Sequence, residues 1–103
     1  MPQYFISYHG GRAPESPEQG AKQMAEWKAW LDNLGDAVIN PGTPLMNGAT
    51  VTSANVSTDG APFSMAGFSV IEAADMDAIL EIAKACPMLA IDGTLGVAEM
   101  KQM

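Results

Sequence analysis

One long helix signal in the first third of the chain constrains the fold most. Ser16 suits the helix cap, Pro17 suits the first helical position, and Gln19 would reach back to the cap backbone. Apolar side chains then recur at helical spacing: Met24, Trp27, Trp30, Leu31 and Leu34. Gly35 is well placed to end the element. We therefore expect a helix between Ser16 and Gly35 that buries one apolar stripe.

Short runs rich in β-branched and aromatic residues surround this helix and predict strands. The expected strands are residues 4–8, 37–40, 49–56, 67–73 and 94–100. A second helix is expected to start at the cap Asp75 and to end before Pro87. Its apolar positions are Met76, Ile79, Leu80 and Ala83.

This order of elements predicts an α+β fold, a ferredoxin-like antiparallel sheet with two helices on one face. Several strands nevertheless carry apolar residues on both faces, such as Phe68 and Val70 on one face and Ile71 and Ala73 on the other. The second face therefore needs a cover. We expect the same face of a second copy, which gives a homodimer through the sheet, although a long loop folding back would also serve.

The 103 residues predict a single domain over 1–103. A net charge of -7 opposes binding to nucleic acid and to anionic lipid surfaces. The N-terminal residues do not resemble a signal peptide, and no apolar run is long enough to span a bilayer. We accordingly expect a cytoplasmic protein.

The single cysteine and the single histidine limit the possible chemistry. Cys86 has no partner for a disulfide within the chain, and we expect it to be an inert core residue. His9 has no neighbours at the spacing of a metal site, and no nucleotide motif occurs. The sequence thus predicts no metal and no cofactor.

The segment "STDGAPFSMAGF", residues 57 to 68, contains a turn signal followed by apolar residues. Gly60 takes a positive φ without steric cost, and the Asp59 side chain can bond nearby backbone amides. We therefore expect a chain reversal that leads into a buried strand.

From "TDGAPFSMAGFSVIEAADMDAILEIAKACP" through "GTLGVAEM" the chain resembles the YCII-related family, in the branch named for an Asp-Gly-Pro-Phe motif. The resemblance implies a dimeric α/β barrel of ferredoxin-like subunits, in a family whose members mostly lack an assigned reaction. Ala61 stretches the motif to Asp-Gly-Ala-Pro-Phe. Some relatives also carry a histidine near the start of the first helix, and residues 16–35 contain none.

Candidate site residues gather at the end of the first strand and in the segment after Asp59. His9 is able to exchange protons near neutral pH, and Asp59 is the candidate partner that would hold its tautomer. Arg12 would anchor a substrate carboxylate by paired hydrogen bonds, and Phe63 and Phe68 would line an apolar pocket. A turn role for Asp59, a structural role for His9 and a core role for the aromatic residues are the alternatives.

Two functional classes follow from these residues. The first is a small homodimeric protein of unassigned activity that binds a small apolar or aromatic molecule in the cleft between sheet and helices. The alternative is a cofactor-free acid/base enzyme, of isomerase, lyase or dehalogenase type, acting on a small ring compound with His9 and Asp59 as the proton-handling pair. The sequence leaves open whether the chain is an enzyme.

Overall fold

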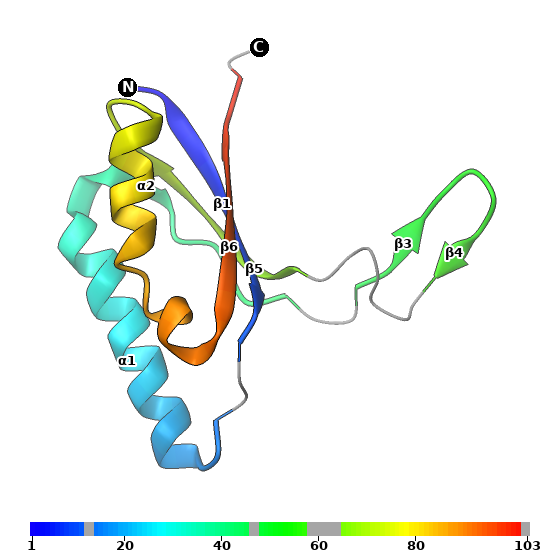
Figure 1. Cartoon of the computed structure of the whole chain (residues 1–103), viewed down its shortest axis with the longest axis horizontal. Helices are drawn as coiled ribbons and strands as arrows, with labels where there is room; N and C mark the ends of the chain where they lie inside the picture. The colour runs from blue at the N-terminus through cyan, green and yellow to red at the C-terminus, as the bar shows by residue number, and fades with distance from the viewer. Residues whose placement is uncertain (12–13, 46–47, 58–64, 102–103) are drawn as a thin grey trace.

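The computed structural model describes residues 1–11, 14–45, 48–57 and 65–101. The chain forms a four-stranded antiparallel sheet with two helices on one of its faces (Figure 1). The order of strands across the sheet is β2 (Val38–Asn40), β5 (Met65–Glu72), β1 (Gln3–Gly10) and β6 (Gly93–Glu99). This confirms the predicted α+β, ferredoxin-like fold.

Helix α1 (Pro17–Leu34) starts as the sequence indicates. The Ser16 Oγ accepts a hydrogen bond from the Gln19 backbone N–H at 3.1 Å, while the Gln19 side chain accepts from the Glu15 backbone N–H rather than from that of the cap. Gly35 follows the last helical residue with a φ of 57°, a conformation that favours glycine, and opens the short 3₁₀ turn η1 (Gly35–Ala37).

Helix α2 (Met76–Lys84) is capped by Asp75, whose carboxylate accepts from the Ala78 N–H at 2.9 Å. It leads into a second 3₁₀ turn, η2 (Pro87–Ile91). Asp92 then takes a left-handed conformation, which reverses the chain into β6. Ile79 and Ala83 of α2 are buried as expected, whereas Met76 and Leu80 remain 39% and 40% exposed.

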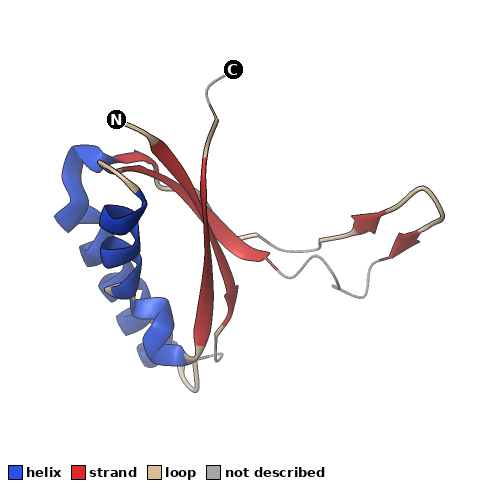
Figure 2. Cartoon of the chain, turned by 45° about the horizontal axis from the view of Figure 1, so that its top comes forward, coloured by secondary structure: helices blue, strands red, loops and turns tan. Residues whose placement is uncertain are grey.

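The prediction of a single strand over residues 49–56 is wrong. The structure has two short strands here, β3 (Thr50–Val51) and β4 (Val56–Ser57), which pair with each other and not with the main sheet. The Thr52 side chain explains the reversal, because its Oγ1 accepts from the backbone N–H groups of Ala54 and Asn55. The resulting hairpin projects from the body on the side away from the helices (Figure 2).

The two faces of the sheet have different surroundings. We call the face against the helices the helix face; its strand residues are Tyr4, Ile6, Tyr8, Ser69 and Ile71, which pack with Trp30, Leu31, Ile79 and Cys86 in the core. The opposite, open face carries Phe5, Ser7, His9, Phe68, Val70, Gly96 and Ala98. In the described part of the chain neither helix lies against the open face (Figure 2). No helix among the described residues is both long and apolar enough to cross a membrane.

Candidate functional site

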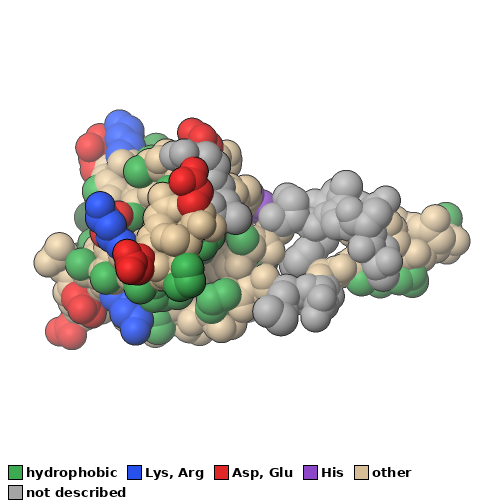
Figure 3. All heavy atoms as spheres, turned by 90° about the horizontal axis from the view of Figure 1, so that it is seen from below, with side chains coloured by type: hydrophobic (Ala, Val, Ile, Leu, Met, Phe, Trp, Pro, Cys, Tyr) green, Lys and Arg blue, Asp and Glu red, His purple; other side chains and the backbone are tan. Residues whose placement is uncertain are grey.

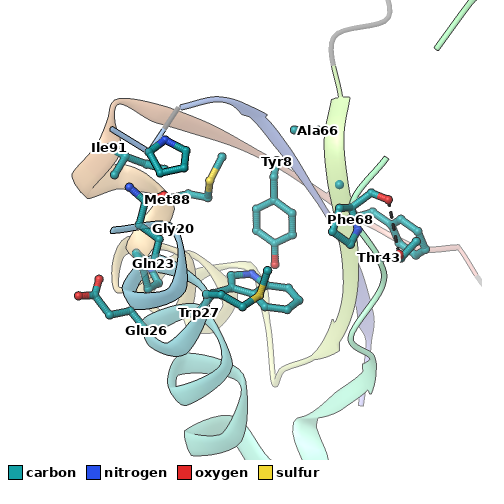
Figure 4. A pocket seen from close by; sticks show the side chains of 15 residues that line it. Tyr8, Gly20, Gln23, Glu26, Trp27, Thr43, Ala66, Phe68, Met88 and Ile91 are labelled. Atoms are coloured by element: carbon teal, nitrogen blue, oxygen red, sulfur yellow. Dashed lines mark hydrogen bonds between the residues drawn. The ribbon is translucent and has the colours of Figure 1, made fainter. Parts of the chain in front are cut away.

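A pocket of about 330 Å³ lies between the first half of α1 and the helix face of the sheet (Figure 4). Its walls come from α1, the end of β1, the start of β5, the segment before Leu45, and η2. The lining residues are Tyr8, Pro14, Gly20, Gln23, Met24, Glu26, Trp27, Thr43, Pro44, Ala66, Gly67, Phe68, Pro87, Met88 and Ile91. Glu26 is the only charged residue in this set, and its carboxylate points away from Tyr8 in Figure 4. The pocket is therefore essentially apolar.

Tyr8 forms one wall of the pocket, and its hydroxyl group is tied into the fold. It donates to the Ser69 Oγ at 2.8 Å, and Ser69 donates in turn to the Pro41 carbonyl oxygen at 2.8 Å. Burial is the main cause that raises the pKa of Tyr8 above its ordinary value, and the bond to Ser69 opposes this only in part. The phenol is consequently held neutral with its ring facing the cavity.

Two tryptophans of α1 have different roles. Trp30 is buried, and its indole N–H donates to the Ile82 carbonyl oxygen at 3.2 Å, which ties α1 to α2. Trp27 is one helical turn earlier and half-buried, and its ring meets Tyr8 edge to face with centroids 6.4 Å apart. The indole of Trp27 thus packs against the core and also lines the pocket.

Two glycines permit the close packing of the pocket wall. Gly42 has a φ of 76°, and a Cβ there would lie 1.6 Å from the Phe68 carbonyl oxygen. Gly67 faces Tyr8, where a Cβ would come within 3.2 Å of the Thr43 carbonyl oxygen and 3.6 Å of the Tyr8 ring. Larger residues at these two positions would push the Pro41–Pro44 segment away from β5.

The structure places His9 on the open face, on the other side of the sheet from the pocket. Its Nε2 lies 2.8 Å from the Ser7 Oγ, two residues earlier on the same face. Phe68 stacks its ring on Phe5 with centroids 5.8 Å apart and also contributes to the pocket wall. The described residues thus bring His9 together with Ser7, a partner that the sequence analysis did not consider.

Arg12, Asp59 and Phe63 lie outside the described residues. The acid/base pair of His9 and Asp59 and the carboxylate anchor at Arg12 therefore stay predictions. Ala61 and the turn at Gly60 lie in the same segment.

Sequence reasoning considered a ligand in the cleft between sheet and helices, but it missed the residues of α1 that line the pocket, because it assigned the whole apolar stripe of this helix to the core. Only Trp30 and Leu31 of this helix are buried, whereas Met24 is 45% exposed. The available signal was the length of α1, which has 18 residues against 9 in α2. The first half of a longer helix extends past its neighbour, so its apolar side chains line a cavity there.

Cys86 is the buried core residue that the sequence predicts, and burial raises the pKa of its thiol. Within the part of the chain that the structure describes, no group of three or more histidine, cysteine or acidic residues is arranged to hold a metal ion.

By its fold the chain belongs to the ferredoxin-like α+β class. Among solved structures, it is similar to 5-chloro-2-hydroxyhydroquinone dehydrochlorinase (TftG) of Burkholderia phenoliruptrix in complex with 2,5-dihydroxybenzoquinone, with a TM-score of 0.62 and 20% sequence identity. The match covers 98% of this chain and 95% of the other. No family model matches the sequence, and no curated protein matches it. The similarity therefore establishes the shared fold.

Proposed function

We propose that this chain binds a small, uncharged ring compound in the pocket between α1 and the helix face. The apolar lining of the pocket is the observation that carries this proposal. Its volume of about 330 Å³ suits a small ring, since ligand pockets run from roughly 300 to 1,000 Å³. The solved structure with the same fold holds 2,5-dihydroxybenzoquinone, which is itself a small ring compound.

The rings of Tyr8 and Trp27 support an aromatic or quinone-like ligand. They meet at 80°, so a planar molecule can stack on one ring and present its edge to the other. The thioethers of Met24 and Met88 adapt to irregular outlines. Gln23 and Thr43 supply polar groups to the lining, which would orient a hydroxyl or carbonyl group of the ligand.

A matched pair of methionines tests this proposal. Met24 lines the pocket and is 45% exposed, while Met76 is 39% exposed on α2 and does not line it. Binding of hydroquinone and of benzoquinone is measured by calorimetry and by tryptophan fluorescence. We expect Met24→Ala to weaken binding about tenfold, which corresponds to roughly 1.4 kcal/mol, and Met76→Ala to leave it unchanged. Equal affinities for the two variants, or no binding by the wild-type chain, would contradict the proposal.

The second candidate is a cofactor-free acid/base enzyme acting on a small ring compound. The activity in the name of the solved relative, a dehydrochlorinase, favours it, as does the presence of an ionisable His9 on the sheet. The proposed proton-handling pair is His9 with Asp59. The ring proton signals of the single histidine, followed by NMR across pH in wild type and in Asp59→Asn, test the coupling. A titration curve that the substitution does not move would exclude this pair.

We further infer that a second copy of the chain covers the open face. In the described parts of β1, β5 and β6, the ionisable residues on this face are His9 and Glu72, so contact there brings few like charges together in a chain of net charge -7. Phe5→Lys is expected to convert a dimer into a monomer by sedimentation, whereas Leu89→Lys on η2 is expected not to. A wild-type monomer at all concentrations would refute the dimer. We also propose that the chain is a member of the YCII-related family.

A further inference from the structure

The hairpin formed by β3 and β4 is built without support from the rest of the chain. Its two strands have two residues each and pair only with each other. None of the residues 50–57 lines the pocket or belongs to the core. A two-stranded hairpin on its own is at best marginally stable in water, and it needs a further strand or a packing partner. The hydrogen bonds at Thr52 fix the turn, but they supply no such partner.

A pair of valines gives the hairpin an apolar side. Val51 and Val56 are register partners, so their side chains lie next to each other on the same face of the hairpin, and both are exposed. Residues 50–57 contain no ionisable side chain. In a chain of net charge -7, this uncharged segment is able to approach another copy without bringing like charges together. The valine pair is therefore a contact surface that suits a second copy of the chain.

The position of the hairpin agrees with such a contact. It projects from the body on the side away from the helices, which is the side of the open face (Figure 2). Its base is held beside β5, where the Leu45 backbone N–H donates to the Ala66 carbonyl oxygen at 2.8 Å. Val51 follows Leu45 by six residues, which span at most about 20 Å when extended. Because packed sheets lie about 10 Å apart, the hairpin is long enough to run alongside the sheet of a copy on the open face.

We propose that the hairpin is an arm that packs its valine pair against the second copy of the chain and that each copy receives the arm of the other. This inference rests on the dimer proposed above. The two-fold symmetry of such a dimer makes the exchange reciprocal. Each hairpin gains the packing partner that it lacks in a single chain, and the dimer gains apolar contacts outside the sheet.

Isotope-filtered NMR tests the contact directly. Chains with ¹³C-labelled methyl groups and unlabelled chains are unfolded together in equal amounts and refolded, so that mixed dimers form. We expect NOEs from the methyl protons of Val51 and Val56 to protons of the unlabelled copy. Val70 on the open face reports the sheet contact in the same spectrum, and Leu80, which is exposed on α2, is the control without contacts. NOEs from Val70 to the unlabelled copy without any from the valine pair would overturn the arm.

Sedimentation of variants measures what the arm contributes. Val51→Asp and Val56→Asp are each expected to raise the dissociation constant of the dimer about tenfold or more. Val51→Thr and Val56→Thr keep a β-branched side chain and are expected to raise it roughly three- to fivefold. Leu80→Asp is the control and should leave it unchanged. An aspartate that melts the hairpin also withdraws the arm, so the expected weakening does not depend on the folding of the hairpin. A dimer as stable as wild type in both aspartate variants would overturn the proposal.

The possible failures are distinguishable. A wild-type chain that is monomeric at all concentrations would refute the dimer and the arm together. A dimer that keeps its sheet contact but lacks contacts from the valine pair would refute the arm alone. Ring binding in the pocket is tested by Met24→Ala against Met76→Ala, so its failure would leave the arm unaffected.

Discussion

The two faces of one sheet carry different chemistry, although their residues alternate along the same strands. On β1 the helix face has Tyr4, Ile6 and Tyr8, each at most 4% exposed, whereas the residues between them remain half-buried on the open face. Ionisable groups follow this division, because Tyr8 is held neutral on the helix face while His9 lies on the open face. The contrast indicates that the helix face provides the core and an apolar pocket, whereas the open face carries His9 among apolar side chains.

Charge over the whole surface extends this contrast. The acidic and basic side chains visible in Figure 3 lie over the body, and the hairpin residues 50–57 include none. The hairpin instead exposes Val51 and Val56, which are register partners and 73% and 63% exposed. The described hairpin residues 50–57 are therefore free of formal charge, in contrast to the body.

The largest expected difference between the faces is in stability. Ile6 is fully buried on the helix face, and Ile6→Ala should lower the free energy of unfolding by about 3 kcal/mol through lost burial and the cavity left behind. Phe5→Ala, one residue earlier on the open face, should cost about 1 kcal/mol although it removes more atoms. Denaturant unfolding of both variants measures the difference. Equal losses would show that the open face is as tightly packed as the core.

The sequence predicted the framework of this contrast because local signals and burial agree there. The cap at Ser16, the alternation in β1 and the stop at Pro87 each reflect a strong local preference, and each element formed as expected. The prediction of one strand over residues 49–56 was wrong because threonine and valine favour an extended chain without fixing its partner. The hydrogen bonds that the Thr52 side chain accepts from nearby backbone N–H groups select a tight hairpin instead.

The candidate site was less predictable, because it depends on contacts between distant parts of the chain. No local pattern indicates that Met24 faces a cavity while Trp30 faces the core, since both belong to one helical stripe. The Ser7–His9 pair was in principle readable, because residues two apart on a strand share a face. The close approach of the Ser7 hydroxyl to Gly96 was not, since it depends on the register between β1 and β6.

The next largest expected effect is a pH dependence of the free energy of unfolding, caused by Tyr8 on the helix face. The pKa of Tyr8 is raised in the fold, so the folded state favours the neutral phenol. Stability should therefore be unaffected below the ordinary tyrosine pKa of 10.0 and should fall as pH rises above it. The pKa of Tyr4 is raised in the same direction, chiefly by burial, so Tyr8→Phe should reduce this alkaline loss without abolishing it.

Unfolding experiments between pH 8 and 11 measure this dependence. Tyr8→Phe should also cost about 1 kcal/mol at neutral pH, since Ser69 loses the hydrogen bond that it accepts. His9→Gln is the control from the open face and should retain the full alkaline loss. The same slope in wild type and Tyr8→Phe would contradict a raised pKa at Tyr8.

The smallest expected effect, and the most selective, comes from a pair of glycines on the two faces. Gly67→Ala places a Cβ 3.2 Å from the Thr43 carbonyl oxygen. At this distance the backbone around Thr43 has to shift by a few tenths of an ångström. Gly96→Ala instead meets the Ser7 hydroxyl, which can rotate away. Each change should cost about 1 kcal/mol or less. Gly67→Ala should weaken ring binding in the pocket and leave the NMR signals of His9 unchanged. Gly96→Ala should change the NMR signals of His9 and leave ring binding in the pocket unchanged. If both variants altered both readouts, the two faces would be coupled through the sheet, and the separation argued from their side chains would have to be abandoned.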